Sequence, residues 1–93
     1  MINPKFKLRM KREMSSEKPA IWIGKGGLTD QLVKEISRQL DKNEIVKAKI
    51  LKSALRNEDA DSLIQKVTQE TNSTLIDKRG HVFTLYRRRK KSL

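Results

Sequence analysis

The stretch AIWIGKGGLT, residues 20–29, joins a short apolar run to an amphipathic helical pattern that begins near Thr29. Its glycine-rich turn consists of Gly24, Lys25, Gly26 and Gly27. Glycine allows positive φ and lets the backbone approach a ligand closely. The first N–H groups of the following helix lack intrahelical partners and carry the positive end of the helix dipole. We therefore predict that the turn, with Lys25, binds a phosphate oxygen.

The spacing of the glycines distinguishes between kinds of phosphate-binding loop. A mononucleotide-binding loop ends in Gly-Lys-Ser/Thr, and a dinucleotide fold needs G-x-G-x-x-G. The chain has neither pattern. Gly24 and Gly27 instead fit the G-x-x-G loop that clamps a nucleic-acid backbone in KH-type modules. An ordinary tight turn between a strand and a helix would use the same glycines, so both interpretations stay open at this point.

The composition favours a polyanionic partner. The 93 residues carry a formal charge of +11, from 22 Lys and Arg against 11 Asp and Glu. A surplus of this size is typical of nucleic-acid binding. Binding to a membrane surface would require a basic amphipathic helix with apolar anchors, which Phe6, Leu8 and Met10 supply only sparsely. We expect nucleic acid, and no membrane, as the partner.

The length and residue usage indicate one domain, residues 1–93, with a basic tail at about 88–93. There is no cysteine, no apolar signal-peptide region near the N-terminus and no apolar run of the roughly 20 residues that a membrane span needs. We expect a cytoplasmic monomer without a cofactor. His81 is the only histidine, so we expect no metal site.

Apolar periodicity predicts alternating helices and strands. Val46, Ala48 and Ile50 alternate with lysines, as in a strand with one buried face. The predicted elements are a basic helix over about Lys5–Ser15, a strand over Ala20–Ile23, a helix from Thr29 to Asn43, a strand over Glu44–Leu51, a helix capped by Asn57 with Leu63, Ile64 and Val67 as its inner stripe, and strands near Ser73–Asp77 and His81–Arg87 joined through Lys78-Arg79-Gly80.

Four motifs in this order resemble a CRM domain, named for chloroplast RNA splicing and ribosome maturation: IGKGGLT at 23–29, VKAKI at 46–50, KRG at 78–80 and LYR at 85–87. The chain is similar to stand-alone prokaryotic members of the YhbY-like type over about residues 5–88. The resemblance implies an α/β fold with a four-stranded mixed sheet and packed helices, similar to the C-terminal domain of bacterial translation initiation factor three. It also implies RNA binding through the G-x-x-G loop and, for stand-alone members, association with precursors of the large ribosomal subunit.

The predicted interface combines the glycine turn with basic side chains. Arg9 and Arg12 on the first helix would extend it into a basic strip that reaches Lys25. The predicted RNA-binding residues are Gly24, Lys25, Gly26, Gly27, Arg9, Arg12, Lys47, Lys49, Lys78, Arg79 and Arg87. Trp22 and Tyr86 could stack on bases, but we expect both to pack within the fold.

Catalysis is not expected, because the sequence offers no nucleophile–base set and no paired carboxylates outside one cluster. That cluster, Glu58, Asp59 and Asp61, suits the positive end of a helix dipole. Three functions remain open: binding of structured ribosomal RNA or pre-ribosomal particles in large-subunit assembly or maturation, a subunit of another ribonucleoprotein or RNA-processing complex, and a DNA-compacting basic protein.

Overall fold

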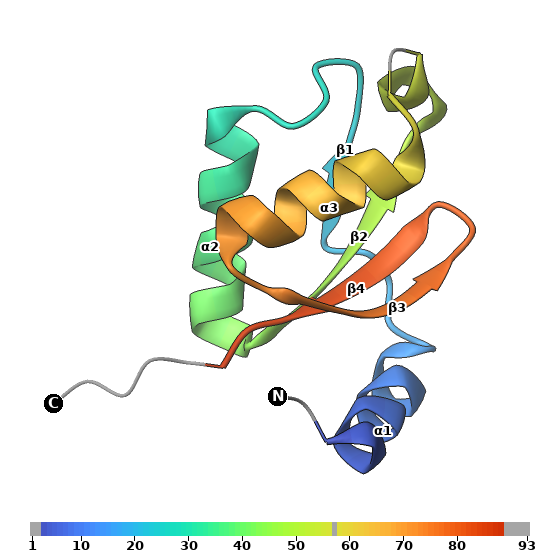
Figure 1. Cartoon of the computed structure of the whole chain (residues 1–93), viewed down its shortest axis with the longest axis vertical. Helices are drawn as coiled ribbons and strands as arrows, with labels where there is room; N and C mark the ends of the chain where they lie inside the picture. The colour runs from blue at the N-terminus through green and yellow to red at the C-terminus, as the bar shows by residue number, and fades with distance from the viewer. Residues whose placement is uncertain (1–2, 57, 89–93) are drawn as a thin grey trace, which may run out of the picture.

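The computed structural model describes residues 3–56 and 58–88 (Figure 1). Every helix and strand predicted from the sequence is present in the predicted order, and a short 3-10 helix, η1, is added after the second strand. The elements are α1 (Pro4–Met14), β1 (Ile21–Ile23), α2 (Asp30–Asn43), β2 (Ile45–Ile50), η1 (Lys52–Leu55), α3 (Ala60–Thr71), β3 (Thr74–Arg79) and β4 (Val82–Tyr86).

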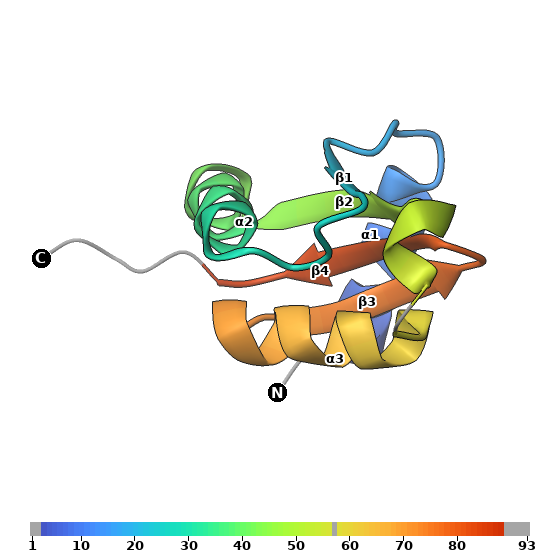
Figure 2. The same ribbon diagram turned by 90° about the horizontal axis from the view of Figure 1, so that it is seen from above.

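The strands form the predicted four-stranded mixed sheet, in the order β1-β2-β4-β3. β1 runs parallel to β2, and the other neighbours are antiparallel. Helices α2 and α3 cover one face of the sheet and α1 lies on the opposite face (Figure 2). Because β1 and β2 are parallel, the C-terminal ends of both strands lie at the same end of the sheet. The glycine turn and η1, which follow these strands, are therefore neighbours.

The core lies between the sheet and the pair α2–α3. Val46, Ala48 and Ile50 are buried as the alternation predicts, together with Phe83 and Leu85 of β4. The helices contribute the predicted inner stripe of α3 and two residues of α2: Leu63, Ile64, Val67, Ile36 and Leu40. Burial of this apolar face, at about 25 cal/mol per Å², fixes the sheet against the two helices.

Two predicted boundaries differ from the structure. The N-cap of α3 is Asp59, whose side chain accepts the N–H of Ser62, so the prediction of a cap at Asn57 is wrong; Asn57 itself lies outside the described residues. Lys78 and Arg79 belong to β3 instead of the hairpin turn. Gly80 alone, with φ of 59°, supplies the left-handed conformation predicted for that turn.

Helix α1 packs on the outer face of the sheet, which is the face opposite α2 and α3. The ring of Phe6 meets Tyr86 edge-on at a centroid distance of 5.2 Å, and Met10 is buried. Tyr86 therefore packs within the fold, as expected. The ammonium group of Lys47 donates to the carbonyl oxygens of Met14 at 2.8 Å and Glu17 at 2.7 Å, and so satisfies the C-terminal end of α1.

No helix in the described ranges is long and apolar enough to cross a bilayer.

Candidate nucleic-acid interface

The glycine turn is a tight reversal at the end of β1. The N–H of Gly27 donates to the carbonyl of Gly24 at 2.8 Å, and Gly27 has a φ of 65°. Only Gly27 among the three glycines of the turn has a left-handed backbone, which L side chains rarely adopt. A Cβ at Gly26 would lie 3.5 Å from Cγ2 of Thr29, an ordinary contact. Glycine is thus conformationally required at one position of the turn.

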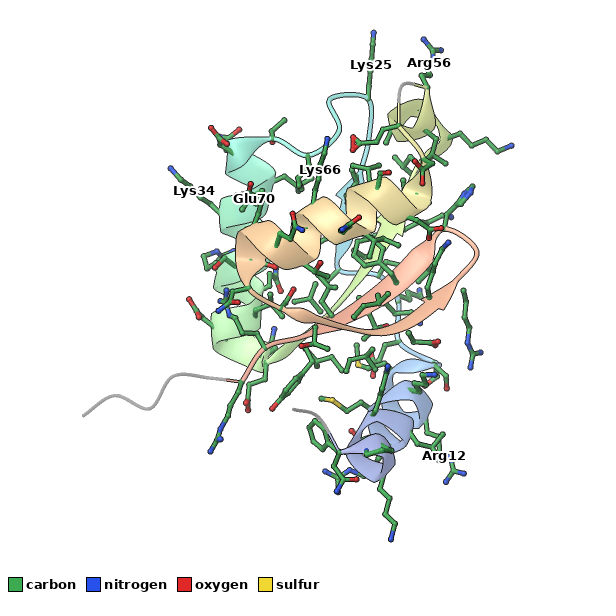
Figure 3. All side chains as sticks on the ribbon, viewed as in Figure 1. Arg12, Lys25, Lys34, Arg56, Lys66 and Glu70 are labelled. Carbon is green, nitrogen blue, oxygen red and sulfur yellow. The ribbon has the colours of Figure 1, made fainter. Side chains whose placement is uncertain are left out.

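Lys25 is exposed at the tip of this turn, and its side chain points away from the body of the protein (Figure 3). Within the described residues its ammonium group has no hydrogen-bond or ion-pair partner. A lysine in this state keeps its charge for an external anion and loses no internal contact when it binds one. Lys25 is therefore accessible to an anion, and its contact with phosphate stays a prediction.

The start of α2 contributes less to anion binding than the sequence suggested. The hydroxyl of Thr29 caps the helix and accepts the N–H of Leu32 at 3.1 Å, as predicted. Asp30 in the first turn places a carboxylate at the positive end of the dipole. An incoming phosphate would meet this carboxylate, so the favourable field comes from Lys25 more than from the helix end.

A pocket of about 350 Å³ lies beneath the turn and carries charges of both signs. Lys25 and Lys66 line it together with Asp30, Glu58 and Glu70. Lys66 is paired, with its nitrogen 2.7 Å from Oε1 of Glu58. Three carboxylates disfavour a phosphate inside this pocket, so a nucleic-acid backbone would contact the outer rim of the turn.

Two cations that the sequence analysis missed lie beside the turn. Lys52 on η1 and Arg56 just after it are exposed, and Arg56 points outward at the same end of the protein as Lys25 (Figure 3). Lys49, which was predicted, is exposed on β2. The parallel pairing of β1 and β2 brings these residues together. We call Lys25, Lys49, Lys52 and Arg56 the loop-end cations; in the described residues none has an ion-pair partner.

The predicted residues of the β3–β4 hairpin are partly engaged within the chain. The ammonium group of Lys78 lies 2.6 Å from Oδ1 of Asp61, at the start of α3. Arg79 forms a 3.2 Å ion pair with Asp77, yet 72% of its side chain is exposed. Arg79 therefore remains accessible to an outside partner, whereas Lys78 serves the contact between β3 and α3.

Two further predicted residues have internal roles. Lys47 caps the end of α1, as described above. Arg87 donates hydrogen bonds to Ser37, Asp41 and Thr71, and its side chain is only 20% exposed. Their charged groups are already occupied, so we leave both residues out of the interface proposed below.

Arg9 and Arg12 lie far from the turn. Figure 3 shows Arg12 and Lys25 at opposite ends of the protein, which measures 39 Å along its longest axis. Arg9 sits over the ring of Phe6 at 5.5 Å and lies 3.8 Å from Glu13. A basic strip from α1 to Lys25 would thus have to run the length of the molecule, and a short RNA segment at the turn would not reach both.

The expectation that Trp22 packs within the fold is wrong. Its neighbours Ile21 and Ile23 are buried, but 54% of Trp22 is exposed. Successive side chains of a strand point to opposite faces, so the burial of both isoleucines directs Trp22 to the outer face of the sheet. β1 is the edge strand on that side, and α1 packs nearer the opposite edge.

The groups with shifted pKa values have structural causes. Hydrogen bonds from the side chain and backbone of Ser62 lower the pKa of Asp59, and Arg38 and Gln39 lower the pKa of Glu35. In the described part of the chain, no group of three or more acidic, histidine or cysteine residues could hold a metal ion.

The chain is similar to known proteins over most of its length. The CRS1 / YhbY (CRM) domain matches residues 2–87. A probable RNA-binding protein of Methanocaldococcus jannaschii is 31% identical over 88 residues, which are 95% of this chain but 65% of that protein. The probable RNA-binding protein YqeI of Bacillus subtilis is 25% identical over 92 residues, covering 99% of this chain and 94% of YqeI.

The fold also has a solved counterpart. The solution structure of a hypothetical protein from Staphylococcus aureus, described as a candidate RNA-binding protein, matches with a TM-score of 0.76 and 25% identity. The match covers 100% of this chain and 95% of that one. Because the family match covers nearly all of the residues, the chain belongs to the CRS1 / YhbY (CRM) domain family.

Proposed function

We propose that this protein binds RNA, gripping the phosphate backbone with the turn of residues 24–27 and the loop-end cations. The observation that carries the proposal is Lys25, which stands exposed and unpaired among the described residues at the tip of a tight glycine turn. Lys49, Lys52 and Arg56 lie on or just after the neighbouring β2 and η1, and none of them has an ion-pair partner in the described ranges. The names of the M. jannaschii and B. subtilis relatives, both probable RNA-binding proteins, support the same function.

The role is binding and not catalysis. Clustered cations around a backbone turn hold phosphates in position, and such contacts carry no sequence information. Aromatic residues make up only 4% of the chain, so base stacking is limited. Specificity must then come from the arrangement of several backbone segments in space, which is a property of folded RNA. We therefore propose structured ribosomal RNA as the target, in large-subunit assembly or maturation.

The loop can be tested with two double variants of equal charge change. Lys25→Asp with Gly26→Asp alters the turn by three charge units, and Gly26 accepts a side chain without strain. Arg12→Asp with Ser16→Asp makes the same change at exposed positions toward the opposite end of the protein. We expect the loop variant to lose most of its affinity for a large-subunit ribosomal RNA fragment, and the far-end variant to lose much less. Equal losses would refute the loop as the binding site.

A milder variant, Lys25→Ala, measures how much a single cation contributes to RNA affinity. Replacing Lys25 with Ala removes one charged donor, which should weaken binding by about 1.5–3 kcal/mol. Circular dichroism should be unchanged, because Lys25 has no contact within the described residues that the fold would lose. The affinity is measured by fluorescence anisotropy of labelled RNA at fixed salt, since salt alone changes such affinities by orders of magnitude.

The choice of nucleic acid is tested by competition at that same salt. The competitors are the ribosomal RNA fragment, the fragment with its helices disrupted, a homopolymer of equal length and duplex DNA. We expect the intact fragment to compete best, and the protein to co-sediment with precursors of the large subunit. Equal competition by all four would mean that only charge is recognised, and the ribosomal role would lose its physical basis.

A further inference from the structure

Two exposed apolar residues occupy neighbouring backbone positions at one edge of the sheet. In the described part of the chain, the exposed large apolar residues are Leu8, Trp22 and Leu51, at 50%, 54% and 37%. Trp22 and Leu51 both belong to the β1–β2 edge: Trp22 lies in β1, and the N–H of Leu51 donates to the carbonyl of Ile23 at 2.9 Å. Neither residue contributes to the grip on phosphate proposed above.

Lys49 lies next to Trp22 in a row of paired residues that crosses the whole sheet. Trp22 is the parallel partner of Lys49 on β2, Lys49 pairs with Val82 on β4, and Val82 pairs with Arg79 on β3. Directly paired residues share a face of the sheet, so Trp22, Lys49 and Arg79 all lie on the outer face. Lys49 and Arg79 are both exposed. Arg79 is on β3, the opposite edge strand, so we call only Trp22, Lys49 and Leu51 the outer patch.

Helix α1 leaves this part of the outer face open. Its contacts fall on neighbouring rows of the sheet, where Phe6 meets Tyr86, Lys11 lies 3.9 Å from Asp77, and Lys47 reaches the end of the helix. Trp22 is therefore exposed although the same face is covered elsewhere. A large apolar ring that the fold leaves uncovered, beside the exposed Lys49, is suited to a ligand that is both flat and anionic.

We propose that Trp22 stacks on an unpaired base of the RNA whose backbone is held at the loop end, with Lys49 contacting a phosphate beside that base. This inference rests on the RNA binding proposed above and adds a base contact to it. Trp22 and Lys25 are three residues apart, so their Cα atoms are at most about 10 Å from each other. Nucleotides that are close together on one strand could thus reach both residues.

The chemistry of the outer patch favours a nucleotide over an apolar protein segment. A protein-docking surface usually exposes a contiguous apolar patch of several hundred Å². Here one aromatic ring and one leucine lie beside Lys49, whose charge would lose hydration beneath an apolar partner. Stacking on an aromatic ring tolerates any base, and neighbouring cations hold the backbone. This arrangement fits a single-stranded segment within or beside a folded RNA.

The test uses Trp22 itself, because it is the only tryptophan of the chain. A short single-stranded oligoadenylate is titrated into the full-length protein at fixed salt, with a ribose-phosphate chain of equal length lacking bases as the second probe. We expect oligoadenylate to quench the tryptophan fluorescence and the abasic chain to leave it nearly unchanged. Binding of both probes is followed independently by anisotropy of an attached label.

Substitution gives a second measurement. Trp22→Leu keeps an apolar side chain but removes the ring, and should weaken oligoadenylate binding roughly 5- to 150-fold while changing abasic-chain binding little. Trp22→Phe should recover part of this loss. Leu8→Ala is the matched control, because Leu8 is similarly exposed but lies on α1. It should bind both probes like the unaltered protein.

The outcomes separate this inference from the proposed function. If the ribosomal RNA fragment and oligoadenylate bind by anisotropy, yet tryptophan fluorescence is unchanged and Trp22→Leu binds normally, the stacking site is refuted and RNA binding stands. If no RNA binds to the unaltered protein, the proposed function fails and the stacking site fails with it. Quenching that persists in the Lys25→Asp and Gly26→Asp double variant at higher RNA concentration would support a stacking site separate from the loop.

Discussion

The sequence predicts that Arg87 contacts RNA, whereas in the structure its guanidinium is bonded within the fold. Substituting Arg87 therefore tests which of the two roles it has. Its two terminal nitrogens donate to the hydroxyl of Ser37 at 3.0 Å, to the carbonyls of Ser37 and Thr71 at 2.7 Å each, and to the carboxylate of Asp41 at 2.7 Å. One guanidinium thus ties the end of β4 to both α2 and α3. Removing it leaves the two carbonyls without these donors.

The magnitude follows from these contacts. A hydrogen bond to a charged group contributes about 1.5–3 kcal/mol. The bond to Asp41 counts for little because that side chain is 69% exposed, and the other three bonds share one donor group. We therefore expect Arg87→Ala to lower the free energy of unfolding by about 2–4 kcal/mol. For a domain of this size the melting temperature should fall by about 10–25 °C.

The assay is urea unfolding followed by circular dichroism, since Trp22 is too exposed to report well on the core. Arg88→Ala is the matched control: it removes the same charge one residue later, at an exposed position. Arg87→Lys should restore less than half of the stability, because a single ammonium group does not reproduce the planar fork of arginine.

Two results would refute this reasoning. The first is an Arg87→Ala protein whose free energy of unfolding lies within about 0.5 kcal/mol of the Arg88→Ala control. The second concerns RNA: at a temperature where both variants are folded, their affinities for RNA should agree. A loss of affinity confined to Arg87→Ala would show that the guanidinium binds RNA, as the sequence alone suggested.

Two smaller predictions concern the ends of helices and the turn. Asp59→Ala should lower the melting temperature at neutral pH, and Asp59→Asn, which can still cap α3, should not. Hydrogen bonds from Ser62 hold the pKa of Asp59 below its usual value, so the charged cap stabilises the fold fully above the ordinary aspartate pKa of about 3.9. The advantage over Asp59→Ala should shrink below that pH and be lost as the pH falls through the lowered pKa of the folded state. An unchanged gap in melting temperature at acidic pH would contradict this. Gly27→Ala should cost about 1–2 kcal/mol of unfolding free energy, since its φ of 65° disfavours a Cβ, while Gly26→Ala should be neutral or slightly stabilising; equal effects in urea unfolding would show that the turn relaxes.

The order of elements and the core could be predicted because they depend on local patterns. The alternation of Val46, Ala48 and Ile50 determines which face of β2 is buried, and Thr29 caps α2 through a hydrogen bond three residues along the chain. Such signals need no knowledge of the partners in space. The cap of α3 was misplaced because Asn57 and Asp59, two residues apart, can both cap a helix, and the sequence alone does not rank them.

The roles of single cations depend on long-range contacts and could not be predicted. Lys47 alternates with buried residues like any lysine on a solvated strand face, yet its partner Met14 lies 33 residues away. Arg87 reaches Ser37 across 50 residues. Lys52 and Arg56 were missed because no local sequence pattern places them near Lys25. They join Lys25 only because β1 and β2 pair in parallel, and local sequence patterns do not specify which strands pair.

Ion pairs within the fold neutralise only some of its cations. With 22 basic and 11 acidic residues, pairing each acid with one cation still leaves 11 cations over. The acids that pair lie on α1, α2, α3, β3 and just before α3. Helix α1 nevertheless has five basic residues and one acid, and Lys5, Lys7 and Arg12 have no ion-pair partner among the described residues. The loop-end cations have no such partners among the described residues. Screening confines surface charges to about 8 Å at physiological salt, so local clustering matters more than the total. The loop-end cations and helix α1 are therefore two separate groups of unpaired cations, and the loop proposal requires that charge reversal at Lys25 weakens RNA binding more than charge reversal at Arg12.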